Sequence, residues 1–261
     1  MAMRPRKWLD RVTRERAYRG WADLARSKLE FGLSRQRALR DEALALRRKL
    51  DLFLMRTDHR RDLARESLDA LHLPVGTDWR WRPIFMTSTI RPTGIAAPEN
   101  GERLGEQAAV WHDCPERALI LEQIENLRAT DLSPFGLRLE VFGFAGSYLS
   151  VSIDLPDRAL DGLTREHILR LETGLALERP MNVYARLNVA NGPNTDQVLH
   201  QIGDLTPGAQ HQHVIEFDLA YTEINEKRLE KIWIDLIFEA PYMNALAIRE
   251  LFVSRHLRAD F

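Results

Sequence analysis

The chain has 261 residues, of which 44% are hydrophobic and 29% are charged, and its formal net charge is −1. This composition predicts a folded, soluble protein with one large domain, alone or with an extension. The single cysteine, Cys114, excludes an intrachain disulfide and a thiolate metal cluster, and it favours a reducing compartment. The sequence shows neither a secretory signal nor a run of eighteen apolar residues that would span a membrane, so we expect a cytoplasmic protein.

The charge is unevenly distributed along the chain. Residues 1–73 contain 19 Lys and Arg against 11 Asp and Glu, whereas residues 74–261 contain 18 against 27. A basic segment of net charge +8 is therefore joined to an acidic body of net charge −9. We expect the basic segment to lie on the body, on a protein partner or on a polyanion.

Residues 1–73 are predicted to be helical, because Ala, Leu, Arg, Lys and Glu dominate and the only proline is Pro5. In the second half, apolar residues recur at alternating spacings of four and three, as in a helix that packs on another helix: Leu39, Ala43, Leu46, Leu50 and Phe53. This apolar seam is only slightly longer than two heptads, so the helix needs a partner surface. We expect a helical hairpin or an oligomerisation arm.

The first half of this segment combines aromatic residues such as Trp8 and Trp21 with many arginines, as a basic amphipathic helix does. One interpretation is that its apolar side packs on the second helix while the arginines are solvated. The other is peripheral contact with an anionic membrane surface. The expected partner of residues 1–73 is a second copy of the chain or another protein; nucleic acid is not expected.

Residues 74–106 are predicted to be a connector, because four prolines and four glycines interrupt any long regular element. Trp79, Trp81, Ile84 and Phe85 are too apolar for a free linker. We therefore expect an extended Pro/Gly-rich segment that packs on the following domain, with the two tryptophans as anchors.

Residues 107–261 are predicted to form an antiparallel β-sandwich of the jelly-roll type. About nine candidate strands are separated by turn residues, and no helical crossovers join them. They are AAVWHD, ALILEQI, LRLEVFGF, SYLSVSIDL, HILRLETGLAL, MNVYARLNV, HVIEFDLAY, KIWIDLIFE and ALAIRELFVSR. The predicted fold class is mainly β, with an α-helical N-terminal extension.

Alternation divides four of these strands into a buried face and an outer face. The outer positions carry two aromatic residues among carboxylates, an arginine and an amide. If the strands share a sheet, these are candidate ligand-binding residues: Tyr184, Arg186, Asn188, Glu216, Asp218, Trp233 and Asp235. An aromatic ring under the apolar face of a sugar, with planar polar groups bonding its hydroxyls, is typical of carbohydrate recognition. The alternative is an ordinary solvated face.

The stretch Asn188–Val198, NVANGPNTDQV, follows one of these strands. Pro193 prevents the strand from continuing, and Gly192 and its asparagine neighbours tolerate left-handed conformations. Because the stretch is longer than a two-residue hairpin, we predict a structured end loop, with Asn191 and Asn194 as further candidate ligand-binding residues.

The common hydrolase, nucleotide-binding and zinc-protease motifs are absent from the sequence, which argues against an enzyme. His211 and His213 lie on one side of a strand, but a third metal ligand is not identifiable. Glu216, Asp218 and Asp235 provide an acid/base pair only if two of them lie about 5–10 Å apart. We therefore predict no catalytic residue, no metal site and no cofactor.

The stretches LILEQIENLRATDLSPFGLRLEVFGFAGSYLSVSIDLP and RLNVANGPNT resemble a domain-of-unknown-function family of alphaproteobacteria, over roughly residues 74–261. That resemblance implies no activity. The ending KIWIDLIFEAPYMNALAIRELFVSR is similar, more distantly, to the closing strand pair of galactose-binding-like jelly rolls, which occur in carbohydrate-binding modules. This second resemblance implies a jelly roll and a carbohydrate ligand. Such modules often hold a structural calcium, whose ligands are not identifiable in this sequence.

We therefore predict a non-catalytic protein that binds carbohydrate or a glycan-bearing surface and has a helical attachment arm. The alternative is a structural protein whose helices oligomerise or dock on a cell-envelope or particle partner. A glycan-active enzyme that uses the sheet-face carboxylates is a weaker alternative. The expected location is the cytoplasm, peripheral to a membrane or within a larger assembly.

Overall fold

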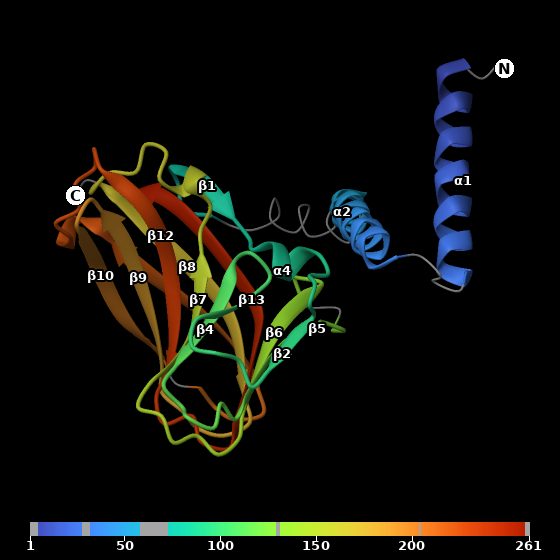
Figure 1. Cartoon of the computed structure of the whole chain (residues 1–261). Coiled ribbons are helices and arrows are strands. Elements are labelled where there is room, and N and C mark those ends of the chain that lie inside the picture. Colours follow the sequence, from blue (N-terminus) through green and yellow to red (C-terminus); the bar gives the residue numbers. More distant parts are fainter. Residues whose placement is uncertain (1–4, 28–31, 58–72, 129–130, 204, 259–261) are drawn as a thin grey trace. The chain divides into compact units, whose positions relative to one another are not determined.

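The computed structural model describes residues 5–27, 32–57, 73–128, 131–203 and 205–258 (Figure 1). The chain divides into two compact units, Met1–Arg56 and Thr57–Phe261, and each is described by itself. Residues 58–72 of the predicted helical segment lie outside the described residues. The predicted connector falls within the second unit.

The first unit contains two helices, α1 (Pro5–Arg26) and α2 (Leu33–Thr57). Residues of high helix propensity fill both, and their only proline is the first residue of α1, where a missing N–H costs no intrahelical hydrogen bond. The prediction of N-terminal helices is confirmed for these residues. In the described part of the chain, no helix is long and apolar enough to cross a membrane.

The predicted apolar seam of α2 is only partly covered within the first unit. Trp21 and Leu24 of α1 and Leu39 of α2 line one cavity of about 430 Å³, so the beginning of the seam faces α1. Further along α2, the side chains of Leu46 and Leu50 are exposed. The helices therefore present apolar side chains that this unit does not bury.

The second unit is a β-sandwich of two antiparallel sheets, which confirms the predicted fold class (Figure 1). In the six-stranded sheet the order is β10-β9-β12-β7-β4-β3. In the seven-stranded sheet it is β11-β8-β13-β6-β5-β2, and β1 also pairs with β13. The chain passes repeatedly from one sheet to the other, as in jelly rolls.

The strands are β1 (Thr77–Trp81), β2 (Gly94–Ala96), β3 (Glu102–Leu104), β4 (Ala108–His112), β5 (Leu119–Glu125), β6 (Phe135–Val141), β7 (Leu149–Asp154), β8 (His167–Leu177), β9 (Val183–Asn191), β10 (Asn194–Ile202), β11 (Gln210–Asp218), β12 (Leu229–Phe238) and β13 (Asn244–Leu257). A short helix, α4 (Ile84–Thr87), follows β1, and two 3₁₀ turns, η1 (Asp157–Ala159) and η2 (Leu219–Tyr221), precede β8 and β12.

The core lies between the two sheets and consists of the predicted apolar rows. Val151 of β7, Leu187 of β9 and Ile234 of β12 are fully buried in the six-stranded sheet, and Phe217 of β11 is fully buried in the other. Successive side chains of a strand point to opposite faces. The residues between these core positions therefore form the outer faces of the sandwich.

The segment predicted as a connector supplies strands to both sheets. Strand β1 pairs with β13, β2 with β5 and β3 with β4. The rings of Trp79 and Trp81 stack with their centroids 6.5 Å apart and pack against the core. The guanidinium of Arg255 on β13 donates two hydrogen bonds, of 2.9 and 2.7 Å, to the carboxylate of Asp78 on β1. These bonds lower the pKa of Asp78 and tie β1 to β13.

The stretch Asn188–Val198 belongs to a β-hairpin, so the predicted end loop is wrong. Strand β9 ends at Asn191, strand β10 begins at Asn194, and these two residues pair with each other. Gly192 has φ of 61°. A type II′ turn needs a positive φ at the first of its two central residues, and the fixed φ of Pro193 suits the second. The two residues therefore only reverse the chain.

Candidate functional site

The outer face of the six-stranded sheet brings most of the predicted site residues together. Strand β12 lies between β7 and β9, and the register places Trp233 opposite Asn188 and Asp235 opposite Arg186 (Figure 1). Tyr184 lies two residues before Arg186 on β9, on the same face. We call these five side chains the sheet-face site.

Glu216 and Asp218 lie elsewhere, on β11 at the edge of the seven-stranded sheet. The carboxylate of Glu216 pairs with Arg170 at 3.0 Å, and that of Asp218 accepts a 2.9 Å hydrogen bond from the N–H of Ala220 in η2. The predicted condition that all four strands share a sheet therefore fails for these two residues. Since the outer faces of the two sheets point in opposite directions, neither carboxylate forms an acid/base pair with Asp235.

Asp235 is buried although it lies on the outer face. One of its carboxylate oxygens accepts a hydrogen bond from the hydroxyl of Ser152 on β7. The other accepts from Nε and Nη2 of Arg186, at 3.1 and 2.8 Å, and from Nδ2 of Asn188 at 2.9 Å. The protein itself thus satisfies this carboxylate, which holds the arginine and the amide in place.

Around Asp235, two polar atoms have no partner among the residues that the structure describes. The guanidinium of Arg186 is partly exposed, and its Nη1 bonds none of the described residues. The amide oxygen of Asn188 is buried and also has no hydrogen-bond partner within the described ranges. Buried polar atoms in folded proteins nearly always have a partner, so an unpaired one points to a bound water or a ligand.

Trp233 is partly exposed beside this cluster. The ammonium of Lys231 lies 5.3 Å from the centroid of the Trp233 ring and 2.9 Å from a carboxylate oxygen of Asp154. Arg103 contacts the same carboxylate at 2.7 Å. Burial would raise the pKa of Asp154, but the bonds from Lys231 and Arg103 hold it below its ordinary value of 3.8. The tryptophan is thus fixed beside a charged network.

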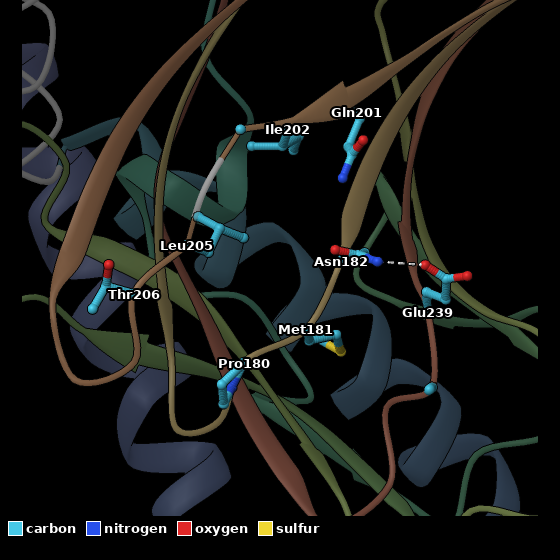
Figure 2. Close-up of a pocket in the computed structure, with 10 residues that line it drawn as sticks. Pro180, Met181, Asn182, Gln201, Ile202, Leu205, Thr206 and Glu239 are labelled. Atoms are coloured by element: carbon cyan, nitrogen blue, oxygen red, sulfur yellow. Dashed lines mark hydrogen bonds between the residues drawn. The ribbon is translucent and has the colours of Figure 1, made fainter.

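A cavity of about 550 Å³ lies where β9 begins and β10 and β12 end (Figure 2). In Figure 2, Ile202 and Leu205 lie on one side of it, and Asn182 and Gln201 lie on the other. The lining residues are Pro180, Met181, Asn182, Gln201, Ile202, Gly203, Leu205, Thr206, Glu239 and Ala240. The cavity therefore combines an apolar side with amide groups and a carboxylate.

Tyr184 joins the sheet-face site to this cavity. Its hydroxyl donates a 3.2 Å hydrogen bond to Oε2 of Glu239, which also accepts from Nδ2 of Asn182 at 2.8 Å. Desolvation and the negative charge of Glu239 raise the pKa of Tyr184, so the hydroxyl keeps its proton and remains a donor. Gln201 pairs with Tyr184 across the β9–β10 ladder and also lines the cavity.

The predicted candidates Asn191 and Asn194 lie at the opposite end of the β9–β10 hairpin. The buried amide of Asn191 donates to Oδ2 of Asp196 at 2.8 Å and accepts from the N–H of Asn225 at 3.1 Å. Seven residues along β9 separate it from Tyr184, which is about 23 Å in a strand. Asn191 therefore holds the hairpin in place, and neither asparagine belongs to the sheet-face site.

Sequence reasoning missed two polar residues of the cavity, Gln201 and Glu239. Gln201 lies on β10, a strand that was not predicted because the hairpin was interpreted as a loop. No clear signal for this strand is present in the sequence, because Leu199, His200 and Gln201 are all exposed and the alternation is broken there. Glu239 follows β12 directly, and nothing in its local sequence distinguishes it from other surface carboxylates.

The predicted pair His211 and His213 has its ring centroids 6.1 Å apart. A ring nitrogen of His211 bonds the backbone of Thr206, and desolvation together with the charge of His211 lowers the pKa of His213. Within the described ranges, no group of three or more His, Cys, Asp or Glu side chains is placed to hold a metal ion.

Comparison with known proteins places the whole chain in one family. A protein-family model described as "Family of unknown function (DUF6478)" matches residues 1–261. The predicted resemblance to a domain of unknown function is thus confirmed, whereas an alphaproteobacterial origin stays a prediction. No curated protein matches the chain.

Several solved structures are similar at low sequence identity. One is the enzymatically active domain of tailspike protein 4 of Bacteriophage CBA120 (7% identity, TM-score 0.41), covering 58% of this chain; the chain spans only 19% of that protein. A xylan-binding domain from Paenibacillus barcinonensis has 10% identity and TM-score 0.38, covering 64% of this chain and 94% of that domain. A family 11 carbohydrate-binding module from Clostridium thermocellum has 9% identity and TM-score 0.40, covering 62% of this chain and 96% of that module. These scores are low, so the fold assignment rests on the observed strands and their pairing.

Proposed function

Since the chain belongs to the DUF6478 family, whose description names no activity, we propose from the site itself that the protein binds carbohydrate on the outer face of its six-stranded sheet. The observation that carries this proposal is the sheet-face site. It holds a partly exposed tryptophan and a partly exposed tyrosine beside an arginine whose Nη1 has no partner among the described residues.

These groups match the chemistry of a sugar ring. A pyranose has an apolar face that stacks on an aromatic ring and hydroxyls that bond planar polar groups. Lys231 lies over the Trp233 ring, so we place the sugar on the opposite side of that ring. Arg186, held by Asp235, then donates from Nη1 to a sugar hydroxyl, and this donor costs little ordering because its carboxylate partner already fixes it.

We propose that this binding is not coupled to catalysis. Hydrolysis of a glycosidic bond needs two carboxyl groups about 5–10 Å apart on either side of the bond. Asp235 is enclosed by Ser152, Arg186 and Asn188, and Glu216 and Asp218 lie on the other sheet. A glycan-active enzyme would therefore need carboxylates other than the ones suggested by the sequence.

The test is a glycan-array screen of the full chain, followed by isothermal titration of Trp233→Ala with the glycan found. Stacking on an aromatic ring contributes roughly 1–3 kcal/mol, so the variant should bind at least about fivefold more weakly. The control is Tyr221→Ala, which removes an exposed aromatic ring of η2 outside the six-stranded sheet. Equal affinity of Trp233→Ala and wild type for that glycan would remove the sheet-face site.

A second function, assembly through the helices, is favoured by the exposed leucines of α2. Leu46 and Leu50, which share one face of the helix, are exposed, although apolar side chains in a helix usually face another protein surface. We propose that this face packs on a second copy of the chain and so acts as an attachment arm. A cytoplasmic location, peripheral to a membrane or within a larger assembly, belongs to the same proposal.

To test the assembly proposal, light scattering measures the mass in solution of two full-length proteins. One is the wild type, and the other is the double variant that combines Leu46→Gln and Leu50→Gln. We expect an oligomer for wild type and a smaller species for the double variant. The matched control replaces two exposed polar residues of the same helix, Arg37→Gln and Arg40→Gln. A monomeric wild type would remove self-assembly and leave docking on another partner.

A further inference from the structure

The cavity at the ends of β9, β10 and β12 adjoins the sheet-face site without being part of it. We infer that it holds the terminal residue of the bound glycan, and that this residue is a sugar without a carboxylate. The inference rests on the proposed carbohydrate binding and adds to it an end-recognising subsite and a charge preference.

The size and the position of the cavity are the first support. The volume of about 550 Å³ lies within the range of small-molecule sites, which is roughly 300–1,000 Å³. Residues from three separate segments line it: those just before β9, the end of β10 with Gly203, Leu205 and Thr206, and those just after β12. The cavity lies at the end of these strands, so a glycan that runs along β9 reaches it with its terminal residue.

The distribution of lining groups is the second support. Pro180, Met181, Ile202 and Leu205 give an apolar surface, and Asn182, Gln201 and Glu239 give hydrogen-bonding groups (Figure 2). A sugar ring has the same division, with an apolar face and a rim of hydroxyls. This combination would leave a fully apolar ligand with unmatched polar neighbours.

Glu239 supplies the acceptor and the charge preference. Both of its protein hydrogen bonds, from Asn182 and Tyr184, end on Oε2. No described residue donates to Oε1, so that oxygen can accept from a sugar hydroxyl. Glu239 is also the only charged residue among those that line the cavity in the described part of the chain. A terminal uronic or aldonic acid would therefore meet a like charge, whereas a neutral sugar would not.

Tyr184 connects the cavity with the rest of the glycan. It belongs to the sheet-face site and donates to the cavity carboxylate, and its cross-strand partner Gln201 lines the cavity. Trp233 is paired with Asn188, four residues further along β9, which corresponds to about 13 Å. A short oligosaccharide that stacks on Trp233 and runs along β9 would place its end at Gln201 and Glu239.

The experiment uses the full chain and matched probes. The probes are neutral oligosaccharides of glucose or galactose with two to six residues, and the same chains oxidised to a uronic acid at the non-reducing terminus or to an aldonic acid at the reducing terminus. Isothermal titration of wild type should give binding about tenfold weaker for the chain oxidised at the end that enters the cavity. Oxidation at the other end should have little effect.

Two variants assign that preference to the cavity. Glu239→Gln keeps an acceptor for Asn182 and Tyr184 but removes the charge, so the neutral and oxidised probes should bind within about twofold of each other. Gln201→Ala should weaken binding of the neutral probe about five- to tenfold, as expected for one lost hydrogen bond. The matched control is Glu216→Gln, which removes one exposed carboxylate from the other sheet and should keep the preference.

The outcomes separate this inference from the proposed function. If Trp233→Ala weakens binding but Glu239→Gln and Gln201→Ala behave like wild type, the sheet-face site stands and the cavity inference is wrong. The cavity inference is equally wrong if wild type binds both oxidised probes as tightly as the neutral one. If wild type binds none of the probes and no glycan of the array, the proposed function fails and the inference fails with it.

Discussion

An arginine–carboxylate cluster lies on the outer face of each sheet, and the two clusters differ in burial. On the six-stranded sheet, the side chain of Asp235 is 5% exposed and that of its partner Arg186 is 34% exposed. On the seven-stranded sheet, Arg170 pairs with both Glu172 and Glu216, and the side chain of Glu216 is 46% exposed. Asp235 is thus buried in its cluster, whereas Glu216 is largely exposed in the other.

The position of the strand in its sheet explains this difference. Strand β12 has β7 on one side and β9 on the other, so Asp235 receives donors from Ser152 and from Asn188 as well as from Arg186. Strand β11 is an edge strand that pairs only with β8 in its sheet. Side chains of a neighbouring strand therefore lie on one side of Glu216, and water lies on the other. The comparison teaches that residue type and outward orientation are not sufficient to identify a site; neighbouring strands on both sides are also needed.

The largest effect is expected for Asp235→Ala. The substitution leaves Arg186, Asn188 and Ser152 without their common acceptor, and breaking a buried pair in this way costs about 3 kcal/mol. We expect this loss in the free energy of unfolding, measured by urea denaturation of the full chain. Glycan affinity should fall as well, because Arg186 is no longer held in place. A loss below about 1 kcal/mol would mean that the cluster is as solvated as the one on the other sheet.

The next effect is expected at the far end of β9, where Asn191 is a buried polar residue outside the sheet-face site. Asn191→Ala removes the donor to Asp196 and the acceptor for the N–H of Asn225, which should cost about 2 kcal/mol of unfolding free energy. The measured affinity for the glycan should stay within about twofold of wild type, since these bonds only hold the hairpin. A selective loss of binding without a loss of stability would instead make Asn191 a ligand contact.

The two clusters also show how far the sequence alone could predict this site. Alternation gave the correct outward orientation for Tyr184, Arg186, Trp233 and Asp235, because side-chain direction in a strand is a local property. The choice of sheet is not local. Glu216 alternates in the same way as Asp235, but strand pairing is decided by contacts between distant segments, and the prediction grouped the two residues wrongly.

The hairpin and the cavity were missed for related reasons. A Gly-Pro turn was expected to interrupt a strand, yet the positive φ of Gly192 and the fixed φ of Pro193 let the chain reverse within two residues. The cavity needs Asn182, Gln201 and Glu239 from three segments that are adjacent only in the folded chain. The core rows were predicted correctly because burial of alternate residues leaves a direct pattern in the sequence.

A smaller effect, with a defined pH dependence, is expected for Asp154→Asn beside the sheet-face site. Lys231 and Arg103 hold the pKa of Asp154 below 3.8 in the folded chain despite the opposing effect of burial. A lowered carboxyl pKa contributes stability that is present above the unfolded value and is lost as the pH falls through the folded value. We expect the variant to be about 1 kcal/mol less stable at pH 7, because both partners are half exposed. In denaturation curves the difference from wild type should shrink as the pH falls below 3.8 and disappear once the pH is below the lowered pKa of the folded chain; a difference that persists at the acid end of this range would show that the bonds do not depend on the charge.

The smallest effect is expected for Glu216→Gln in the Arg170 cluster of the seven-stranded sheet. Its carboxylate pairs with Arg170 at 3.0 Å, but Glu172 pairs with the same guanidinium and remains after the substitution. Both carboxylates raise the pKa of Arg170 against the effect of its burial, so Arg170 stays charged and paired in the variant. We therefore expect a change in unfolding free energy of no more than about 0.5 kcal/mol, and glycan affinity equal to that of wild type.

Urea denaturation and isothermal titration of Glu216→Gln and Asp235→Ala under the same conditions compare the two faces directly. If the two variants lose similar stability, the position of a strand within its sheet is not what distinguishes the clusters, and the assignment of the site to the six-stranded sheet loses its physical basis.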